Sequence, residues 1–170
     1  MRILLLLLCL LLAAPACATE SLEGKVIGVS DGDTITVLVG RTQQVKVRLY
    51  GVDCPESRQA YGNQAKAFTA AAVFGKAVRV EVTGRDRYGR TLGIVYGPEG
   101  SALNRDLLIN GLAWVYGKYC ARPECAQWRN DESAARSAHR GLWGDVKLVP
   151  PWEFRKSAKR PISDTTAPEE

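Results

Sequence analysis

Two short segments of this 170-residue chain carry acidic side chains that could bind a metal ion together. Asp33 lies in the first segment, and Asp53 follows it 20 residues later in the second. A hairpin turn predicted at residues 40–42 would place Asp33 nearly opposite Tyr50 and on the same sheet face as Arg48. Because Asp53 comes three residues after Tyr50, we expect both carboxylates to converge at one rim of the sheet.

The second segment reads Asp-Cys-Pro-Glu over residues 53–56. Pro55 favours an extended conformation at Cys54, which leaves the backbone carbonyl of Cys54 free of helical hydrogen bonds. Two carboxylates and one backbone carbonyl are hard oxygen ligands, and such a set suits Ca²⁺. Glu56 is then placed to contact a metal-bound water. The alternative is ordinary turn and helix-entry chemistry, so the metal prediction depends on these acids meeting Arg48.

A third segment, Asp-Arg-Tyr-Gly-Arg at 86–90, is basic and has the composition of a turn. By itself it is best explained as a solvated hairpin turn whose charges protect a strand edge. Together with the acids, Arg48 and an arginine of this segment could clamp the oxygens of a phosphodiester. Arginine suits that task because its planar guanidinium binds phosphate in a bidentate manner and stays protonated.

The composition is that of a globular protein, with 46% apolar and 24% charged residues. These values exclude a disordered chain, a collagen-like chain and a multi-span membrane protein. Lys and Arg number 23 against 18 Asp and Glu, which gives a formal charge of +5. A modest positive charge permits a polyanionic partner such as nucleic acid without requiring one.

The N-terminus has the pattern of a secretory signal peptide. Arg2 is followed by an apolar run over residues 3–14, which is shorter than the ~20 residues needed to span a bilayer. Small residues follow, and cleavage before Thr19 would remove residues 1–18. We therefore expect a secreted or periplasmic protein without a membrane span. The alternative is a lipoprotein anchored through Cys17.

Five cysteines are present, of which Cys9 and Cys17 belong to the predicted signal peptide. Cys120 and Cys125 flank a short loop and could form a disulfide in an oxidising compartment. A zinc site is the competing interpretation, but it lacks ligands because the chain has a single His. Cys54 would stay unpaired.

The elements that position these segments are predicted from periodicity and turn residues. Strands are expected at 25–29, 35–39, 45–50, 77–82 and 91–96, and helices at 63–74, 103–110 and 124–139. In this register Ile35 would lie opposite Arg48.

This order of elements is that of an α+β, mainly β protein, a five-stranded OB-type barrel with three helices. We expect one domain over residues 19–154 and a polar, mobile tail over residues 155–170, with residues 150–153 docking the chain end against the domain. Nothing in the sequence implies a stable protein partner, and we expect a monomer.

The order and spacing of the motifs resemble those of the thermonuclease (staphylococcal nuclease-like) family. The motifs are Asp-Gly-Asp-Thr at 31–34, Arg-Leu-Tyr-Gly-Val-Asp-Cys-Pro-Glu at 48–56, Asp-Arg-Tyr-Gly-Arg at 86–90, Leu-Asn at 103–104 and Asn-Gly-Leu-Ala at 110–113. The resemblance runs from Gly24 to about Trp143. It implies an OB barrel that cleaves phosphodiester bonds of DNA and RNA with Ca²⁺ and leaves 3′-phosphates.

The resemblance also implies metal ligands. Asp33 and Asp53 resemble the calcium carboxylates of the family, and Asp31 resembles an outer acid that reaches the metal through water. Cys54 stands where the reference enzyme has Thr, which supplies its backbone carbonyl to the metal. Because the ligand is the carbonyl, the exchange need not remove it. Glu56 resembles the residue proposed as general base or water-orienting group.

The remaining site residues concern the substrate. Arg48 and Arg90 resemble the phosphate-clamping pair of the family, and Tyr88 resembles a residue that contacts the nucleotide phosphate. Tyr119 resembles a base-stacking aromatic residue. A different class of function, a catalytically inactive OB module that binds nucleic acid or protein, would be expected to lose some of these acids or arginines. Their presence favours a nuclease.

Overall fold

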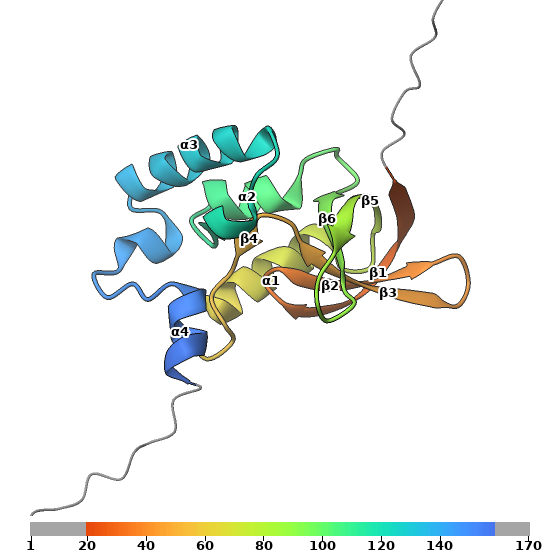
Figure 1. Cartoon of the computed structure of the whole chain (residues 1–170), viewed down its shortest axis with the longest axis horizontal. Helices are drawn as coiled ribbons and strands as arrows, with labels where there is room; N and C mark the ends of the chain where they lie inside the picture. Colours follow the sequence, from red (N-terminus) through yellow and green to blue (C-terminus); the bar gives the residue numbers. More distant parts are fainter. Residues whose placement is uncertain (1–19, 159–170) are drawn as a thin grey trace, which may run out of the picture.

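Five strands close into a barrel in the order β1-β2-β3-β6-β5 (Figure 1). This computed structural model describes residues 20–158. The strands are β1 (Ser21–Asp31), β2 (Thr34–Val39), β3 (Gln43–Leu49), β5 (Ala77–Arg85) and β6 (Thr91–Tyr96). Neighbouring strands are antiparallel except for the parallel pair of β3 with β6. The five-stranded barrel and its mainly β class are as expected from the sequence, and every barrel strand overlaps the segment predicted for it.

The barrel closes around apolar side chains that alternate along its strands. Val37, Val47 and Leu49 are buried, whereas Lys46 and Arg48 between them reach outward or to the rim. A period of two is the pattern of a strand with one face in the core, and it made β3 recognisable in the sequence.

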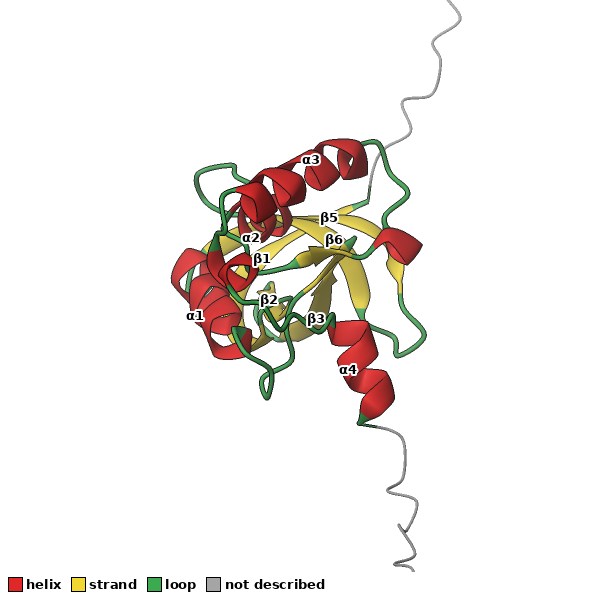
Figure 2. Ribbon diagram, turned by 90° about the vertical axis from the view of Figure 1, so that its left-hand side faces the viewer, coloured by secondary structure: helices red, strands yellow, loops and turns green. Residues whose placement is uncertain are grey.

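Within residues 20–158, four α-helices accompany the barrel, one more than the three expected (Figure 2). They are α1 (Gly62–Val73), α2 (Leu103–Ile109), α3 (Glu124–Ser137) and α4 (Pro151–Ser157). The helix α4 corrects the prediction that a mobile tail begins at residue 155, because Arg155 lies within it. The helix has only seven residues, too few to show helical periodicity, and begins at a proline, which is tolerated at the first helical position.

Two-residue strands and short 3₁₀ helices complete the chain. β4 (Val52–Asp53) pairs with β7 (Trp114–Val115), and 3₁₀ helices span Gly117–Tyr119 and Gly141–Gly144. The β4–β7 pair places Asp53 opposite Trp114 and so joins the end of the barrel to the helical half of the chain. None of the helices within residues 20–158 is both long and apolar enough to cross a membrane.

A buried amide holds the chain that leaves β3. Asn104 of α2 is fully buried. Its side chain donates to the carbonyls of Tyr50 (2.9 Å) and Gly93 (3.2 Å) and accepts from the N–H of Val95 (3.0 Å). Because a buried amide without partners is costly, these three bonds fix α2 against β6 and against the segment between Arg48 and Asp53.

Candidate active site

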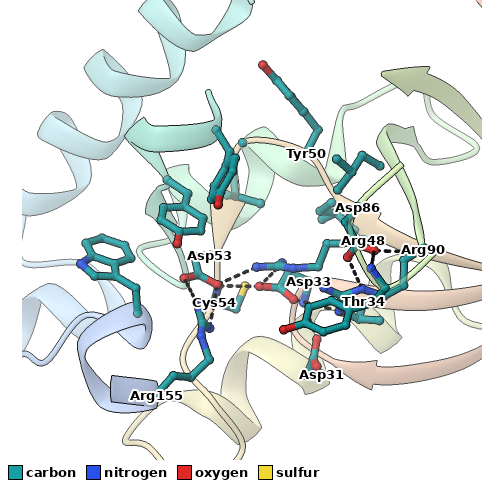
Figure 3. Close-up of a pocket in the computed structure, with 18 of the residues that line it drawn as sticks. Asp31, Asp33, Thr34, Arg48, Tyr50, Asp53, Cys54, Asp86, Arg90 and Arg155 are labelled. Carbon is teal, nitrogen blue, oxygen red and sulfur yellow. Dashed lines mark hydrogen bonds and ion pairs between the residues drawn. The ribbon is translucent and has the colours of Figure 1, made fainter. Parts of the chain in front are cut away.

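One pocket of about 930 Å³ contains all nine residues that the sequence assigned to metal, catalysis or substrate (Figure 3). They are Asp31, Asp33, Arg48, Asp53, Cys54, Glu56, Tyr88, Arg90 and Tyr119. They come from two hairpins of the barrel, the end of β3, the segment after β3, and the 3₁₀ helix that follows β7. The tertiary structure therefore brings together segments up to 88 residues apart in the chain.

Arg48 joins the two principal carboxylates. Its Nη1 forms an ion pair with Oδ2 of Asp33, and its Nη2 lies 2.6 Å from Oδ1 of Asp53. The Asp53 side chain is 0% exposed, so its charge depends on these partners. Burial lowers the pKa of Arg48, but the charges of Asp33 and Asp53 outweigh burial and raise it above its ordinary value. Arg48 therefore stays a cation.

Burial lowers the pKa of a base such as Arg48, but it raises the pKa of an acid such as Asp53. Desolvation raises the pKa of Asp53 above its ordinary value of 3.8, against the lowering effect of its hydrogen bond to Arg155 and of the Arg48 charge. A carboxylate in this position is stabilised by nearby positive charge, either guanidinium or metal.

The turn between β1 and β2 carries Asp33 to Arg48. Gly32 has no room for a side chain, because a Cβ there would lie 2.7 Å from the Cβ of Ala65 and 2.9 Å from Cys54. The Gly32 carbonyl accepts a hydrogen bond from Thr69 of α1 at 2.6 Å. Asp33 Oδ2 in turn accepts the N–H of Cys54 at 2.7 Å. The two acidic segments are thus tied together.

The predicted register of the β2–β3 hairpin is wrong by one residue. Thr34, not Ile35, lies opposite Arg48, and Ile35 lies opposite Val47. The contact between Asp33 and Arg48 forms all the same. Asp33 is a turn residue outside the pleated strand, so strand alternation does not determine the direction of its side chain.

Asp31 lies beside this pair, and its Oδ1 accepts the backbone N–H of Asp33 at 3.2 Å. Burial, followed by the negative charge of Asp33, raises the pKa of Asp31 to about 7. Burial is the larger cause and the charge of Asp33 adds to it, so Asp31 lies in an enclosed and acidic part of the pocket.

The parallel pairing of β3 with β6 brings the basic turn to Arg48. Arg48 lies opposite Leu92, two residues after Arg90. Arg90 Nε donates to Asp86 Oδ2 at 2.6 Å, and the other oxygen of Asp86 accepts the backbone N–H groups of Tyr88 and Arg90. Asp86 therefore orients Arg90 through its Nε. Tyr88 is exposed on the rim, with the Arg90 guanidinium 5.6 Å from its ring centre.

Aromatic side chains form the wall of the pocket next to α4. Tyr119 is exposed and packs edge-on against Tyr116, with 4.8 Å between ring centres. Tyr116 stacks parallel to Trp152 at 5.3 Å. The sequence motifs indicated Tyr119 as a substrate contact but did not indicate Tyr116 or Trp152. The alternation in Trp-Val-Tyr at 114–116, which sends residues 114 and 116 to the same face, was the available signal.

Arg155 is a charged residue of the site that the sequence motifs did not indicate. Its Nη2 lies 2.7 Å from Oδ2 of Asp53, and its Nη1 lies 2.6 Å from Oε1 of Glu56 and 3.2 Å from Oδ1 of Asp53. In Figure 3, Arg155 reaches Asp53 from below, whereas Arg48 reaches it from the right. The Pro-Pro-Trp helix start at 150–152 was the available signal for an ordered segment, but it does not indicate which acids Arg155 meets.

The cysteines have the expected arrangement. Cys120 and Cys125 form a disulfide with their Sγ atoms 2.00 Å apart, and Cys54 is buried with a free thiol. Burial, followed by the charge of Asp33, raises the pKa of the Cys54 thiol well above its ordinary value. Cys54 is therefore a poor nucleophile and meets the site mainly through its backbone.

Whether these residues suit a metal ion depends on their chemistry. Over residues 20–158 no three His, Cys, Asp or Glu side chains are grouped as a preformed metal centre. Asp33, Asp53 and Glu56 offer only carboxylate oxygens, the donors that Ca²⁺ prefers. The donor set therefore fits a hard cation. In this structure the same oxygens are paired with the guanidinium groups of Arg48 and Arg155.

Residues 46–145 match the family model described as staphylococcal nuclease homologue. The matched range includes Arg48, Asp53, Glu56 and Arg90. The chain belongs to this family. The resemblance that the motifs indicated is thereby confirmed, and the five-stranded barrel is consistent with it.

Relatives of this staphylococcal nuclease homologue cover most of the chain. An uncharacterized endonuclease of Escherichia coli O157:H7 is 42% identical over 134 residues, which is 79% of this chain and 85% of the relative. A micrococcal nuclease of Shigella flexneri is 39% identical over 158 residues, 88% of each chain. A probable staphylococcal-like nuclease of Oryza sativa subsp. japonica is 38% identical over 117 residues, 69% of this chain and 34% of the relative.

Proposed function

We propose that this staphylococcal nuclease homologue is a secreted or periplasmic, calcium-dependent nuclease that hydrolyses phosphodiester bonds of DNA and RNA and leaves 3′-phosphates. The observation that carries the proposal is the bridge from Asp33 through Arg48 to Asp53, in a pocket that also contains Glu56 and Arg90. The names of the relatives as endonucleases and micrococcal nuclease support it.

The proposed metal ligands are Asp33, Asp53 and the backbone carbonyl of Cys54, with Asp31 acting through water. Bound Ca²⁺ would supply positive charge that neutralises the phosphate and favours a water nucleophile. The acids already lie close enough to share one guanidinium, so their own repulsion is compensated before substrate arrives.

Arg48 and Arg90 are the proposed phosphate clamp. Arg90 uses its Nε for Asp86, and this bond leaves its terminal nitrogens to face a phosphate. Each arginine donates to oxygens whose negative charge grows in the transition state, which is worth about 3 kcal/mol or more per donor. Arginine keeps its proton up to a pH of ~12, so the pair stabilises charge and transfers no proton.

Glu56 is the proposed general base or water-orienting group. Its carboxylate lies at the pocket rim, with 36% of the side chain exposed, so it can reach solvent water. The water oxygen forms a new bond to phosphorus while Glu56 accepts or directs its proton. The bond from phosphorus to O5′ breaks, O5′ takes up a proton from solvent water, and the phosphate stays on the 3′ side. Tyr88 contacts the phosphate, and Tyr119 stacks on a base.

The direct test is cleavage of heat-denatured DNA by residues 19–170, first with Ca²⁺ and then with EGTA. Glu56→Ser and Arg48→Ala are expected to abolish most cleavage. Arg41→Ala removes a charge at an exposed turn away from the pocket and should cleave like the parent protein. Binding of DNA without cleavage in any metal would reject the enzyme and leave an OB-type binding module.

The proposed location depends on residues 1–18, which lie outside the described residues, as does Cys17. Mass determination of the exported protein tests it. Processing before Thr19 would support a soluble product, whereas a diacylated Cys17 at the N-terminus would establish the lipoprotein alternative.

A further inference from the structure

Every carboxylate oxygen of Asp53 is paired with a guanidinium nitrogen. Oδ1 is 2.6 Å from Nη2 of Arg48 and 3.2 Å from Nη1 of Arg155, and Oδ2 is 2.7 Å from Nη2 of Arg155. Arg155 Nη1 also lies 2.6 Å from Oε1 of Glu56. Arg155 therefore spans the acid proposed as a metal ligand and the acid proposed to handle the nucleophilic water.

The helix α4 holds Arg155 at this position through contacts that do not involve the acids. Pro151 is buried, and Trp152 stacks on Tyr116 and packs edge-on against Trp114 with 6.5 Å between ring centres. Just before the helix, the side chain of Gln59 donates to the carbonyl of Val149 at 2.9 Å. The aromatic packing thus delivers a cation to the pocket.

The charges in the pocket explain why a cation is favourable there. Five acids line it: Asp86, which pairs with Arg90, and the group of Asp31, Asp33, Asp53 and Glu56. Arg48 pairs with two of them, which leaves Glu56 and the second oxygen of Asp53 without a positive partner unless Arg155 supplies one. Like charges in a partly buried site repel, and either a guanidinium or a divalent cation relieves the repulsion.

We propose that Arg155 is a positioning residue that acts as an internal cation: it holds Asp53 and Glu56 in the ion-free protein and competes with Ca²⁺ for Asp53. This inference rests on the proposed calcium dependence. The apparent affinity for an ion is the intrinsic affinity multiplied by the fraction of molecules whose site is free. Arg155 bound to Asp53 reduces that fraction and so weakens Ca²⁺ binding. The packing of α4 thereby sets how much Ca²⁺ the enzyme needs.

The test is Ca²⁺ titration by calorimetry, without substrate, on the chain spanning residues 19–170. Arg155→Gln keeps a long polar side chain and removes the charge, and it should bind Ca²⁺ about five- to tenfold more tightly than the parent. Arg155→Lys keeps a charge but cannot bridge two carboxylates with a planar fork. Its Ca²⁺ affinity should therefore lie between that of the parent and that of Arg155→Gln. It also serves as the second variant if Arg155→Gln folds poorly.

Lys156→Gln is the matched control. Lys156 follows Arg155 in α4 and lines the same pocket, but no ion pair links it to Asp53 or Glu56 in the described structure. Its removal changes the net charge equally and should shift the Ca²⁺ affinity by less than about twofold, the range of a screened surface charge. Equal tightening in Lys156→Gln and Arg155→Gln would overturn the inference, because net charge alone would then explain it.

Hydrogen exchange of residues 151–158 supplies a second measurement. If Arg155 had only a structural role, Ca²⁺ would not change the exchange rate of these residues. Ca²⁺ should speed exchange in the parent protein, since Arg155 is released from Asp53, and should have little effect in Arg155→Gln. Binding of Ca²⁺ with equal affinity by parent and Arg155→Gln would overturn the inference and leave the proposed function standing. Absence of Ca²⁺ binding in every protein would overturn both.

Discussion

The guanidinium of Arg48 and the carboxylate of Asp53 lie 2.6 Å apart, measured from Nη2 to Oδ1, although neither residue could be predicted to be buried from its type. The Asp53 side chain has no exposed surface, and that of Arg48 is 12% exposed. The pair is therefore shielded from solvent, and its attraction is far less screened than that of a surface ion pair. This makes Arg48 important to stability as well as to the proposed chemistry.

Replacing Arg48 by alanine should lower the free energy of unfolding by about 3 kcal/mol, because Asp33 and Asp53 lose a shared buried partner. Urea unfolding monitored by tryptophan fluorescence measures the change. Arg105→Ala is the control, since Arg105 pairs with Asp131 at the surface and should lose less than 1 kcal/mol. Equal losses in the two variants would show that the Arg48 bridge contributes no more than a surface pair.

The bond from Arg90 to Asp86 predicts a specific kinetic effect. Asp86→Asn retains an oxygen for the two backbone N–H groups of the turn but weakens the contact with Arg90 Nε. A misdirected guanidinium should lower kcat/KM for DNA roughly 10- to 100-fold with little change in Tm. Steady-state cleavage assays of Asp86→Asn test this, with Arg41→Gln as the control variant. Unchanged kinetics in Asp86→Asn would mean that Asp86 does not orient Arg90.

Asp131 predicts a dependence of stability on pH. The hydrogen bond from Arg105, with Nε to Oδ2 at 2.7 Å, lowers the pKa of Asp131 below its ordinary value of 3.8. Because the folded pKa is depressed, the stabilisation is present above pH 3.8 and is lost as the pH falls through the folded pKa. The Arg105 side chain is 46% exposed, so the effect stays below about 1 kcal/mol.

The measurement compares Arg105→Ala with the parent protein at neutral pH and in acid. The parent should be slightly more stable at pH 7, and the difference should shrink as the pH falls below about 4. A difference that grows in acid would contradict the assignment of the shift to Arg105.

The arrangement of the cysteines predicts how many thiols per chain react with a thiol reagent. In the chain spanning residues 19–170 the folded protein should not react with a thiol reagent, because the Cys54 thiol is buried and its pKa is raised by burial. Unfolding in denaturant should expose one thiol per chain, and reduction of Cys120–Cys125 should bring the count to three. Rapid reaction of the folded protein would show that Cys54 is accessible.

The barrel was predictable from the sequence because its signals are local. Alternation of apolar residues marked β3, and glycine and asparagine or aspartate marked the turns, since each depends only on neighbouring residues. The β2–β3 register was not predictable to the residue. A shift of one in the assumed hairpin turn moves every cross-strand pair, and the sequence offers no independent constraint on the turn.

Most of the candidate site could also be predicted, because its motifs keep family-like spacing around Asp33, Arg48 and Asp53. Its aromatic wall could not. Tyr116 and Trp152 are 36 residues apart, and each has the type of an ordinary core residue. Only their stacking shows that they form one side of the pocket.

The sequence by itself determined which segments carry chemistry, because acids, arginines and turn residues at 31–34, 48–56 and 86–90 are chemically specific wherever the chain places them. The tertiary structure alone decided that Arg155 reaches Asp53, 102 residues earlier in the chain. That contact depends on where α4 packs, and α4 packs through Trp152 on Trp114 of β7 and on Tyr116. A contact between distant residues follows from the packing of whole elements, which local patterns do not encode.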